Sequence, residues 1–210
     1  MAIDPKKTFD AYQAKRAQFR ILEVPPMQYL MVDGAGDPNT AQEYADAVAA
    51  LYPVAYTLKF ALREQTGLDV VVMPLEGLWH AADMESFTTR RDKSAWQWTM
   101  MIMVPEQVTV PMFAEAVDAV AKKTAKKKQT LPALPLVRLE TLDEGPCVQI
   151  LHVGSYDDEE PVLDDLHHRF IPENGLRMRG RHHEIYLSDA RRVEPAKLRT
   201  ILRQPVAAIS

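Results

Sequence analysis

The chain has 210 residues, 47% hydrophobic and 26% charged, which is the composition of an ordinary globular protein that can bury a full core. It lacks both the apolar run of about 18 residues that a membrane helix needs and the apolar core of a signal peptide, so we expect a cytoplasmic protein. A net charge of −4 argues against direct nucleic-acid binding, and the single cysteine, Cys147, excludes an internal disulfide or a cysteine-based zinc cluster.

The first half of the chain predicts a pair of strands, a long helix and further strands. Apolar residues recur at helical spacing after a turn at residues 33–40, where Asn39 or Thr40 can cap the helix. Pro53 should kink that helix or split it, and Gly67 should end it. The expected strands are residues 19–24, 27–32, 68–73, 77–81 and 95–104, and the expected helices are residues 41–64 and 111–123.

The second half repeats this order of elements in outline. It predicts strands at residues 137–142, 147–153, 182–187 and 198–202 and a helix at residues 159–170. Two copies of a strand–helix–strand–strand unit predict an α+β fold, with antiparallel sheets, helices on one side and a central ligand cleft. We therefore expect an N-terminal arm at residues 1–18 and one domain at residues 19–206, with halves at about 19–130 and 136–206.

The strand expected at residues 182–187 has one polar and one largely apolar face. Side chains alternate along a strand, so His182, Glu184 and Tyr186 share one face. Ile185 and Leu187, on the other face, are natural core residues. The polar face must therefore either meet water or line a pocket.

Tryptophan and methionine follow one another along residues 96–103. Trp96, Trp98 and Met100 share one face of the expected strand, and Met101 lies on the other. Such a stripe is usually plain core, but aromatic walls also hold planar ligands by stacking. We expect Trp79 and one of the other two tryptophans to face a pocket.

Short motifs spread over residues 19–206 together resemble the stand-alone GyrI-like proteins. They are Leu51-Tyr52, Tyr56-Thr57-Leu58-Lys59, and the runs at residues 74–79, 96–98, 149–156 and 182–189. The resemblance implies two pseudo-symmetric halves around a small-molecule cleft. The same fold serves as the effector domain of multidrug-sensing transcription activators and in gyrase inhibitors, and some stand-alone members are cyclopropanoid cyclopropyl hydrolases. His80 departs from the family pattern, in which many relatives carry a second aromatic residue, and this leaves the shape of the pocket open.

Given this resemblance, Glu184 becomes the first candidate for a catalytic residue. A carboxylate on an inward strand face has a raised pKa when it is unpaired, which suits a general base or a counter-charge for a cation. The alternative is a glutamate that is salt-bridged to Arg181 or Arg191. Tyr186 or Tyr56 is the expected donor to the carbonyl oxygen of a ligand whose ring opens.

The expected ligand is an aromatic small molecule, bound without a cofactor or a metal ion. Adjacent histidines on a strand point to opposite faces, so neither histidine pair supplies two metal ligands, and a site built from His152, His182 and Glu184 is a minor alternative. Glu76 is either a second acid–base group or a solvated turn residue. The expected ligand-binding residues are Trp79, Trp96, Trp98, Glu76, Met100, Met101, His152, Tyr156, Lys59 and His182.

These features favour a protein that binds aromatic, drug-like molecules in a central cleft. The leading hypothesis is hydrolysis of cyclopropane-containing, DNA-alkylating natural products, which detoxifies them. A non-catalytic protein that binds or sequesters multidrug-type cations and a gyrase-inhibitor-like interaction protein are the alternatives.

Overall fold

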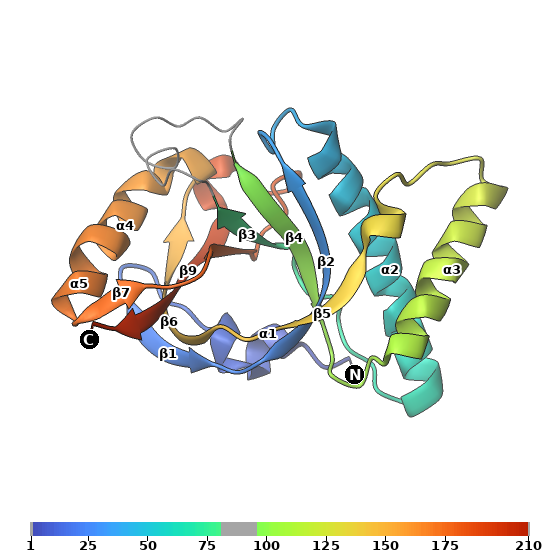
Figure 1. Cartoon of the computed structure of the whole chain (residues 1–210), viewed down its shortest axis with the longest axis horizontal. Coiled ribbons are helices and arrows are strands. Elements are labelled where there is room, and N and C mark those ends of the chain that lie inside the picture. Colours follow the sequence, from blue (N-terminus) through green and yellow to red (C-terminus); the bar gives the residue numbers. More distant parts are fainter. Residues whose placement is uncertain (1, 81–95, 210) are drawn as a thin grey trace.

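Figure 1 shows the computed structural model of the chain, which describes residues 2–80 and 96–209. The architecture is α+β, and every strand pair is antiparallel, which confirms the predicted fold class. The strands are β1 (Arg20–Val24), β2 (Met27–Ala35), β3 (Glu76–His80), β4 (Gln97–Val104), β5 (Arg138–Leu142), β6 (Gly145–Val153), β7 (Leu176–Met178), β8 (His182–Tyr186) and β9 (Arg199–Ala208). The helices are α1 (Pro5–Thr8), α2 (Gln42–Thr66), α3 (Val110–Lys126), α4 (Glu160–Asp164) and α5 (Ile171–Glu173).

The strand order expresses the predicted pseudo-symmetry. The main path of the sheet is β1-β6-β9-β8-β3-β4-β2-β5, and β7 pairs with β9. The triplet β2, β4, β3 of the first half therefore mirrors the triplet β6, β9, β8 of the second half, and β3 pairs with β8 at the centre. The described strands β1 and β5 stand at opposite ends of this path, so the sheet is not closed into a barrel.

The two halves exchange their first strands. β1 pairs with β6 of the second half, and β5 pairs with β2 of the first half. Pro25 and Pro26 join β1 to β2, and proline cannot adopt the positive φ angles that a tight hairpin turn requires. β1 therefore leaves β2 and completes the other half, which ties the two halves into one sheet.

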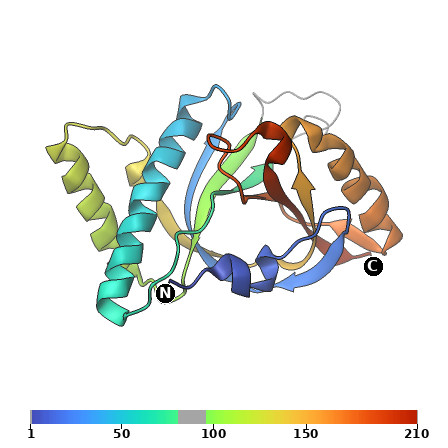
Figure 2. The ribbon, with the colours of Figure 1, turned by 180° about the vertical axis from the view of Figure 1, so that it is seen from behind.

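Helix α2 and the helical segment that contains α4 and α5 cover one face of the sheet, toward its two ends (Figure 1). α2 packs on β2 and β4, and α3 packs on α2. The N-terminal arm, with α1, lies in front in the view from behind (Figure 2), and its Ala11 and Tyr12 contact Arg203 and Glu76 on the other face of the sheet. Leu51, Leu58 and Leu62 of α2 are buried in one apolar core with Leu30 and Ile102 of the sheet. Within residues 2–80 and 96–209, no helix is both long enough and apolar enough to cross a membrane.

Several elements of the first half can be compared with the sequence expectations. α2 runs unbroken through Pro53, so a split helix is wrong, and Gly67 ends the helix with a φ of 76°, as predicted. The strand expected at residues 68–73 is wrong, because only Val70 forms a bridge, to Ile3 of the arm. The ends of two other expected strands, at residues 81 and 95, lie outside the described residues.

Two expected helices also differ from the structure. Asn39 and Thr40 do not cap α2: its N-cap is Ala41, because the Asp37 carbonyl accepts from the N–H groups of Thr40 and Ala41 in a separate turn. The helix expected at residues 159–170 is α4 followed by a π-helical turn, Asp165–Phe170. Such turns are rare and are frequent at functional sites.

Candidate functional site

A cavity of about 960 Å³ lies on the helix-covered face of the sheet. Its floor comes from the central strands β3 and β8, and its walls come from α2 and from the segment between residues 155 and 168. The volume suits a drug-sized ligand, for which pockets of about 300–1,000 Å³ are typical. The aromatic residues of its wall are Tyr44, Tyr52, Tyr56, Trp79, Trp96, Tyr156 and Tyr186.

A chain of hydrogen bonds orients Glu184 in this cavity. Tyr186 Oη donates to Glu184 Oε2 at 2.8 Å, and Trp79 Nε1 donates to Tyr186 Oη at 3.0 Å. Gly77 lies directly opposite Glu184 in the register of β3 and β8. A Cβ atom at position 77 would lie 2.9 Å from Trp79 Nε1 and 3.1 Å from Tyr186 Oη, so a residue without a side chain lets the two groups meet there.

Burial sets the protonation of Glu184. It raises the pKa of this carboxyl to about 7, while the hydrogen bond from Tyr186 opposes the shift. The salt-bridged alternative is not realised among the described residues, since Arg181 donates to Thr99 Oγ1 at 2.7 Å and Arg191 pairs with Asp189 at 2.9 Å. At neutral pH Glu184 therefore exists as both acid and carboxylate, which is the condition for efficient proton transfer.

Glu159 brings a second carboxyl to the cavity. Its side chain is only 3% exposed, and its Oε1 atom has no hydrogen-bond partner among the described residues. Burial, together with the charge of Glu184, raises its pKa well above the ordinary value. Sequence reasoning missed this residue because it stands in the acidic run at residues 157–160, which is typical of a solvated start of a helix.

Two histidines form a neutral part of the wall. His182 on β8 and His167 on the π-helical turn lie edge to face, with ring centroids 5.7 Å apart. Burial lowers the pKa of His182 to about 3 and that of His167 to about 4, so both are uncharged at neutral pH. The described residues gather no group of three potential metal ligands, and His152 instead contacts the Ser155 carbonyl oxygen through Nε2 at 3.0 Å.

Comparison with known proteins decides the family. The family model of the GyrI-like small molecule binding domain matches residues 17–207. The chain belongs to this family. A crystal structure of a Listeria innocua protein described as an uncharacterized conserved protein aligns with a TM-score of 0.85 and 38% identity, over 98% of this chain and 100% of that one. No curated protein matches significantly.

Two further Listeria innocua crystal structures of this kind are described as hydrolases. One has a TM-score of 0.81 and covers 98% of this chain, and the other has a TM-score of 0.83 and covers 99%. Both are 36% identical to this chain and are covered in full. The chain is thus a GyrI-like protein with a small-molecule binding domain, and its cavity is the feature that suits this description.

The GyrI-like cavity brings together part of the predicted set. Among the residues that line it are Glu184, Tyr186, Tyr56, Trp79, Trp96, Tyr156 and His182. Of the two alternatives in residues 96–98, Trp96 faces the cavity, and it meets Trp79 edge to face with ring centroids 5.5 Å apart. Trp98 instead donates to the Gly36 carbonyl oxygen at 3.3 Å. Its indole ring packs directly over Gly34, and a Cβ atom at position 34 would clash with that ring.

The remaining predicted residues lie elsewhere. Met100 is fully buried in the core between β4 and α2, and Met101 points to the opposite sheet face. Lys59 lies away from the cavity and pairs with Asp69 at 3.6 Å. His152 is buried beside the cavity wall rather than in it.

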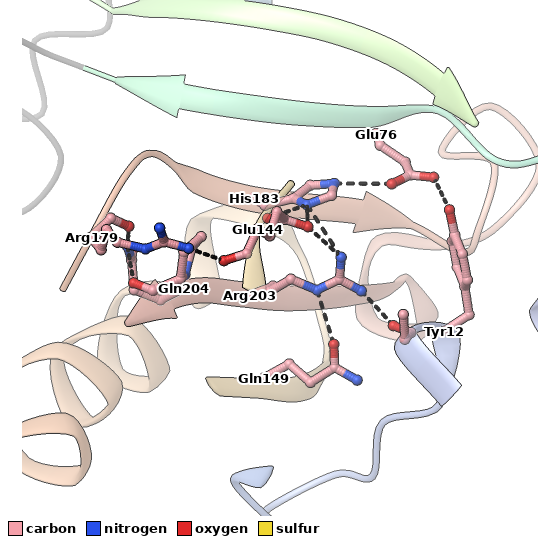
Figure 3. Close-up of polar contacts among 10 residues, drawn as sticks. Tyr12, Glu76, Glu144, Gln149, Arg179, His183, Arg203 and Gln204 are labelled. Atoms are coloured by element: carbon pink, nitrogen blue, oxygen red, sulfur yellow. Dashed lines mark hydrogen bonds and ion pairs between the residues drawn. The ribbon is translucent and has the colours of Figure 1, made fainter. Parts of the chain in front are cut away.

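Glu76 belongs to a buried network on the opposite sheet face (Figure 3). It accepts from Tyr12 Oη at 2.6 Å and pairs with His183 Nε2 at 2.9 Å. The other ring nitrogen of His183 lies 3.0 Å from Glu144 Oε1, and Arg203 Nη1 donates to Glu144 Oε2 at 2.8 Å. Burial alone would lower the pKa of His183, but Glu144 and Glu76 outweigh this effect and raise it.

Proposed function

We propose that this GyrI-like protein is a hydrolase that binds planar aromatic molecules and adds water to the strained cyclopropane of DNA-alkylating natural products. The observation that carries this proposal is Glu184, a carboxyl with a pKa near 7 held in the wall of a drug-sized, aromatic-lined cavity. The two similar Listeria innocua structures described as hydrolases support the reaction class.

Glu184 acts as the general base in the proposed reaction. As a carboxylate it takes a proton from water, and the water oxygen forms a bond to a cyclopropane carbon. The carbon–carbon bond of the ring breaks, and its electron pair passes through the conjugated dienone to the carbonyl oxygen, which becomes a phenolate. Ring strain and aromatisation drive the step, so the protein contributes mainly orientation and proton transfer.

Tyr186 positions the base rather than the ligand. Its one hydroxyl proton is donated to Glu184, and its oxygen accepts from Trp79, so it has no proton left for the ligand oxygen. This narrows the earlier expectation that Tyr186 or Tyr56 stabilises the phenolate. The hydroxyl of Tyr56, on the half-exposed rim of the cavity, keeps that role open.

The aromatic wall supplies the affinity for a planar ligand. Trp79 and Trp96 meet edge to face at 5.5 Å, and Tyr156 and Tyr186 do so at 5.6 Å. These two edge-to-face pairs present both ring faces and ring edges to a flat ligand. An uncharged aromatic ligand also leaves Glu184 free to act as a base.

The test is incubation of the purified protein with a cyclopropane-containing, duocarmycin-type compound, followed by mass spectrometry. We expect the compound to gain one water, and we expect Glu184→Gln to abolish the gain while it still binds the compound, measured by quenching of tryptophan fluorescence. Unchanged turnover in Glu184→Gln would remove Glu184 as the base. Quenching without any gain of water in the wild type would leave a binding protein without this chemistry.

A further inference from the structure

We propose that Glu159 is the general acid of the same cavity and protonates the ligand oxygen on which the electron pair arrives. This inference rests on the proposed hydrolase function and names the group that completes it. The ring opening that Glu184 initiates creates a phenolate. Tyr186, which is hydrogen-bonded to that base, is already engaged, and Tyr56 can offer a hydrogen bond only from the half-exposed rim of the cavity. The reaction therefore needs a separate proton donor inside the cavity.

Glu159 is placed to be that donor. It lines the cavity, it is 3% exposed, and its Oε1 atom has no hydrogen-bond partner among the described residues. An unpartnered buried carboxyl oxygen is costly, and a ligand group that accepts a hydrogen bond there would remove that cost. Glu159 precedes α4 directly, and its backbone N–H donates to the Tyr156 carbonyl oxygen at 3.4 Å, so the chain turns it inward.

The surroundings favour the protonated form of Glu159. Burial and the negative charge of Glu184 raise its pKa well above the ordinary value, and the nearby Thr200 hydroxyl opposes the shift. The titratable groups that interact electrostatically with it include Glu184, Asp157, Tyr156 and Tyr186. None of these four side chains carries a positive charge in any protonation state, so these neighbours do not draw the proton away. The cavity histidines His167 and His182 are uncharged at neutral pH, and Arg191 is paired with Asp189.

The two carboxyls then divide the chemistry between them. Glu184 takes the proton of the attacking water, and Glu159 gives its proton to the ligand oxygen. After one turnover Glu184 is protonated and Glu159 is ionised, and one proton moves between them through solvent to restore the starting state. A pair of carboxyls whose surroundings differ is a common means of running acid and base chemistry in one site.

The cavity tyrosines are weaker candidates for this transfer. Burial raises the pKa of Tyr156 to about 12 and raises that of Tyr44 further. Such hydroxyls can donate a hydrogen bond to a phenolate, but they hold their protons more tightly than the phenol that forms. A buried carboxylic acid keeps its proton to a higher pH than an exposed one and still releases it to a phenolate.

The experiment measures the kcat for addition of water to the duocarmycin-type compound as a function of pH, in wild type and in Glu159→Gln. Glutamine keeps the size of the side chain but cannot transfer a proton. We expect kcat to fall by about 100-fold or more, and we expect the decrease in rate that the ionisation of Glu159 causes on the high-pH side of the profile to disappear. Glu173→Gln, which removes an exposed carboxyl at the end of the helical segment, should leave the kcat and the pH profile unchanged.

A second measurement reads protonation without turnover. The infrared band of a protonated carboxylic acid should be present in the wild type at neutral pH, lost in part in Glu159→Gln and kept in Glu173→Gln. In Glu184→Gln the band of Glu159 should remain. Circular dichroism and thermal unfolding check that each variant is folded.

The outcomes separate this inference from the function on which it rests. No addition of water by the wild type overturns both. Addition of water with full kcat and an unchanged pH profile in Glu159→Gln overturns the assignment of Glu159 and leaves the hydrolase standing. Loss of activity in Glu159→Gln without loss of the infrared band also overturns it, because the residue would then act without a proton to give.

Discussion

At the scale of single residues, Glu184 should lower the stability of the fold at the pH where it works. Its pKa rises from 4.5 to about 7 on folding, so the folded protein binds this proton more tightly than the unfolded chain. Stability is therefore lost as pH rises from 4.5 to 7, by about 3 kcal/mol in total. The side chain that Glu184→Gln introduces cannot ionise. We therefore expect this variant to be more stable than the wild type at about pH 8, which lies above the pKa of Glu184 in both the unfolded and the folded state.

Urea unfolding at several pH values measures this difference. The stabilisation by Glu184→Gln should shrink as pH falls and vanish only below pH 4.5, where the wild-type carboxyl is protonated in the unfolded as well as the folded state. Glu173→Gln, which changes an exposed carboxyl outside the cavity, serves as the control. Equal stability of Glu184→Gln and wild type at every pH would show that the carboxyl is well solvated in the folded protein.

At the scale of elements, the glycine at position 77 of β3 leaves room for the hydrogen bond between Trp79 and Tyr186. An alanine Cβ there would lie 2.9 Å from Trp79 Nε1 and 3.1 Å from Tyr186 Oη, both closer than normal contact. We expect Gly77→Ala to separate the two groups, to release Glu184 from its orientation and to reduce both turnover and ligand affinity. Overpacking of this kind costs about 1–3 kcal/mol of stability.

A double-mutant cycle tests this cause. Trp79→Phe keeps an aromatic ring but removes the nitrogen that the new Cβ atom would contact first. Gly77→Ala should therefore cost less stability in the Trp79→Phe background than in the wild type. Additive losses would mean that Gly77→Ala acts through the backbone of β3 and not through the contact with Trp79.

Alternation along strands explains what could be predicted at this scale and what could not. It grouped His182, Glu184 and Tyr186 on one face, and the cavity lies over that face. Glu76 and Trp79 stand an odd number of positions apart on β3, so the same alternation places their side chains on opposite faces of the sheet. The exchange of first strands between the halves and the inward turn of Glu159 depend on long-range packing, which no local pattern carries.

At the scale of the whole molecule, the N-terminal arm completes the sheet face opposite the cavity. Ala11 and Tyr12 are buried, and Arg203 donates to the Ala11 carbonyl oxygen while Gln149 donates to that of Gln13. The arm thus satisfies buried polar groups that come from β6 and β9 (Figure 3). Although the family model begins at residue 17, the arm is part of the core of this chain.

Tyr12→Phe tests whether this contact stabilises the fold without serving the cavity. The substitution removes the hydroxyl that donates to Glu76 Oε1 at 2.6 Å and leaves that buried oxygen without this donor. We expect a loss of about 1–3 kcal/mol in the free energy of unfolding, measured with urea. As a control, Lys7→Ala changes an exposed residue of the same arm and should alter the free energy of unfolding by less than about 0.5 kcal/mol.

Because the network and the cavity lie on opposite faces of the sheet, the kcat of the folded Tyr12→Phe protein should stay at the wild-type value. A large fall in kcat at full stability would instead show that the arm acts on the cavity through the strands β3 and β8 that carry both.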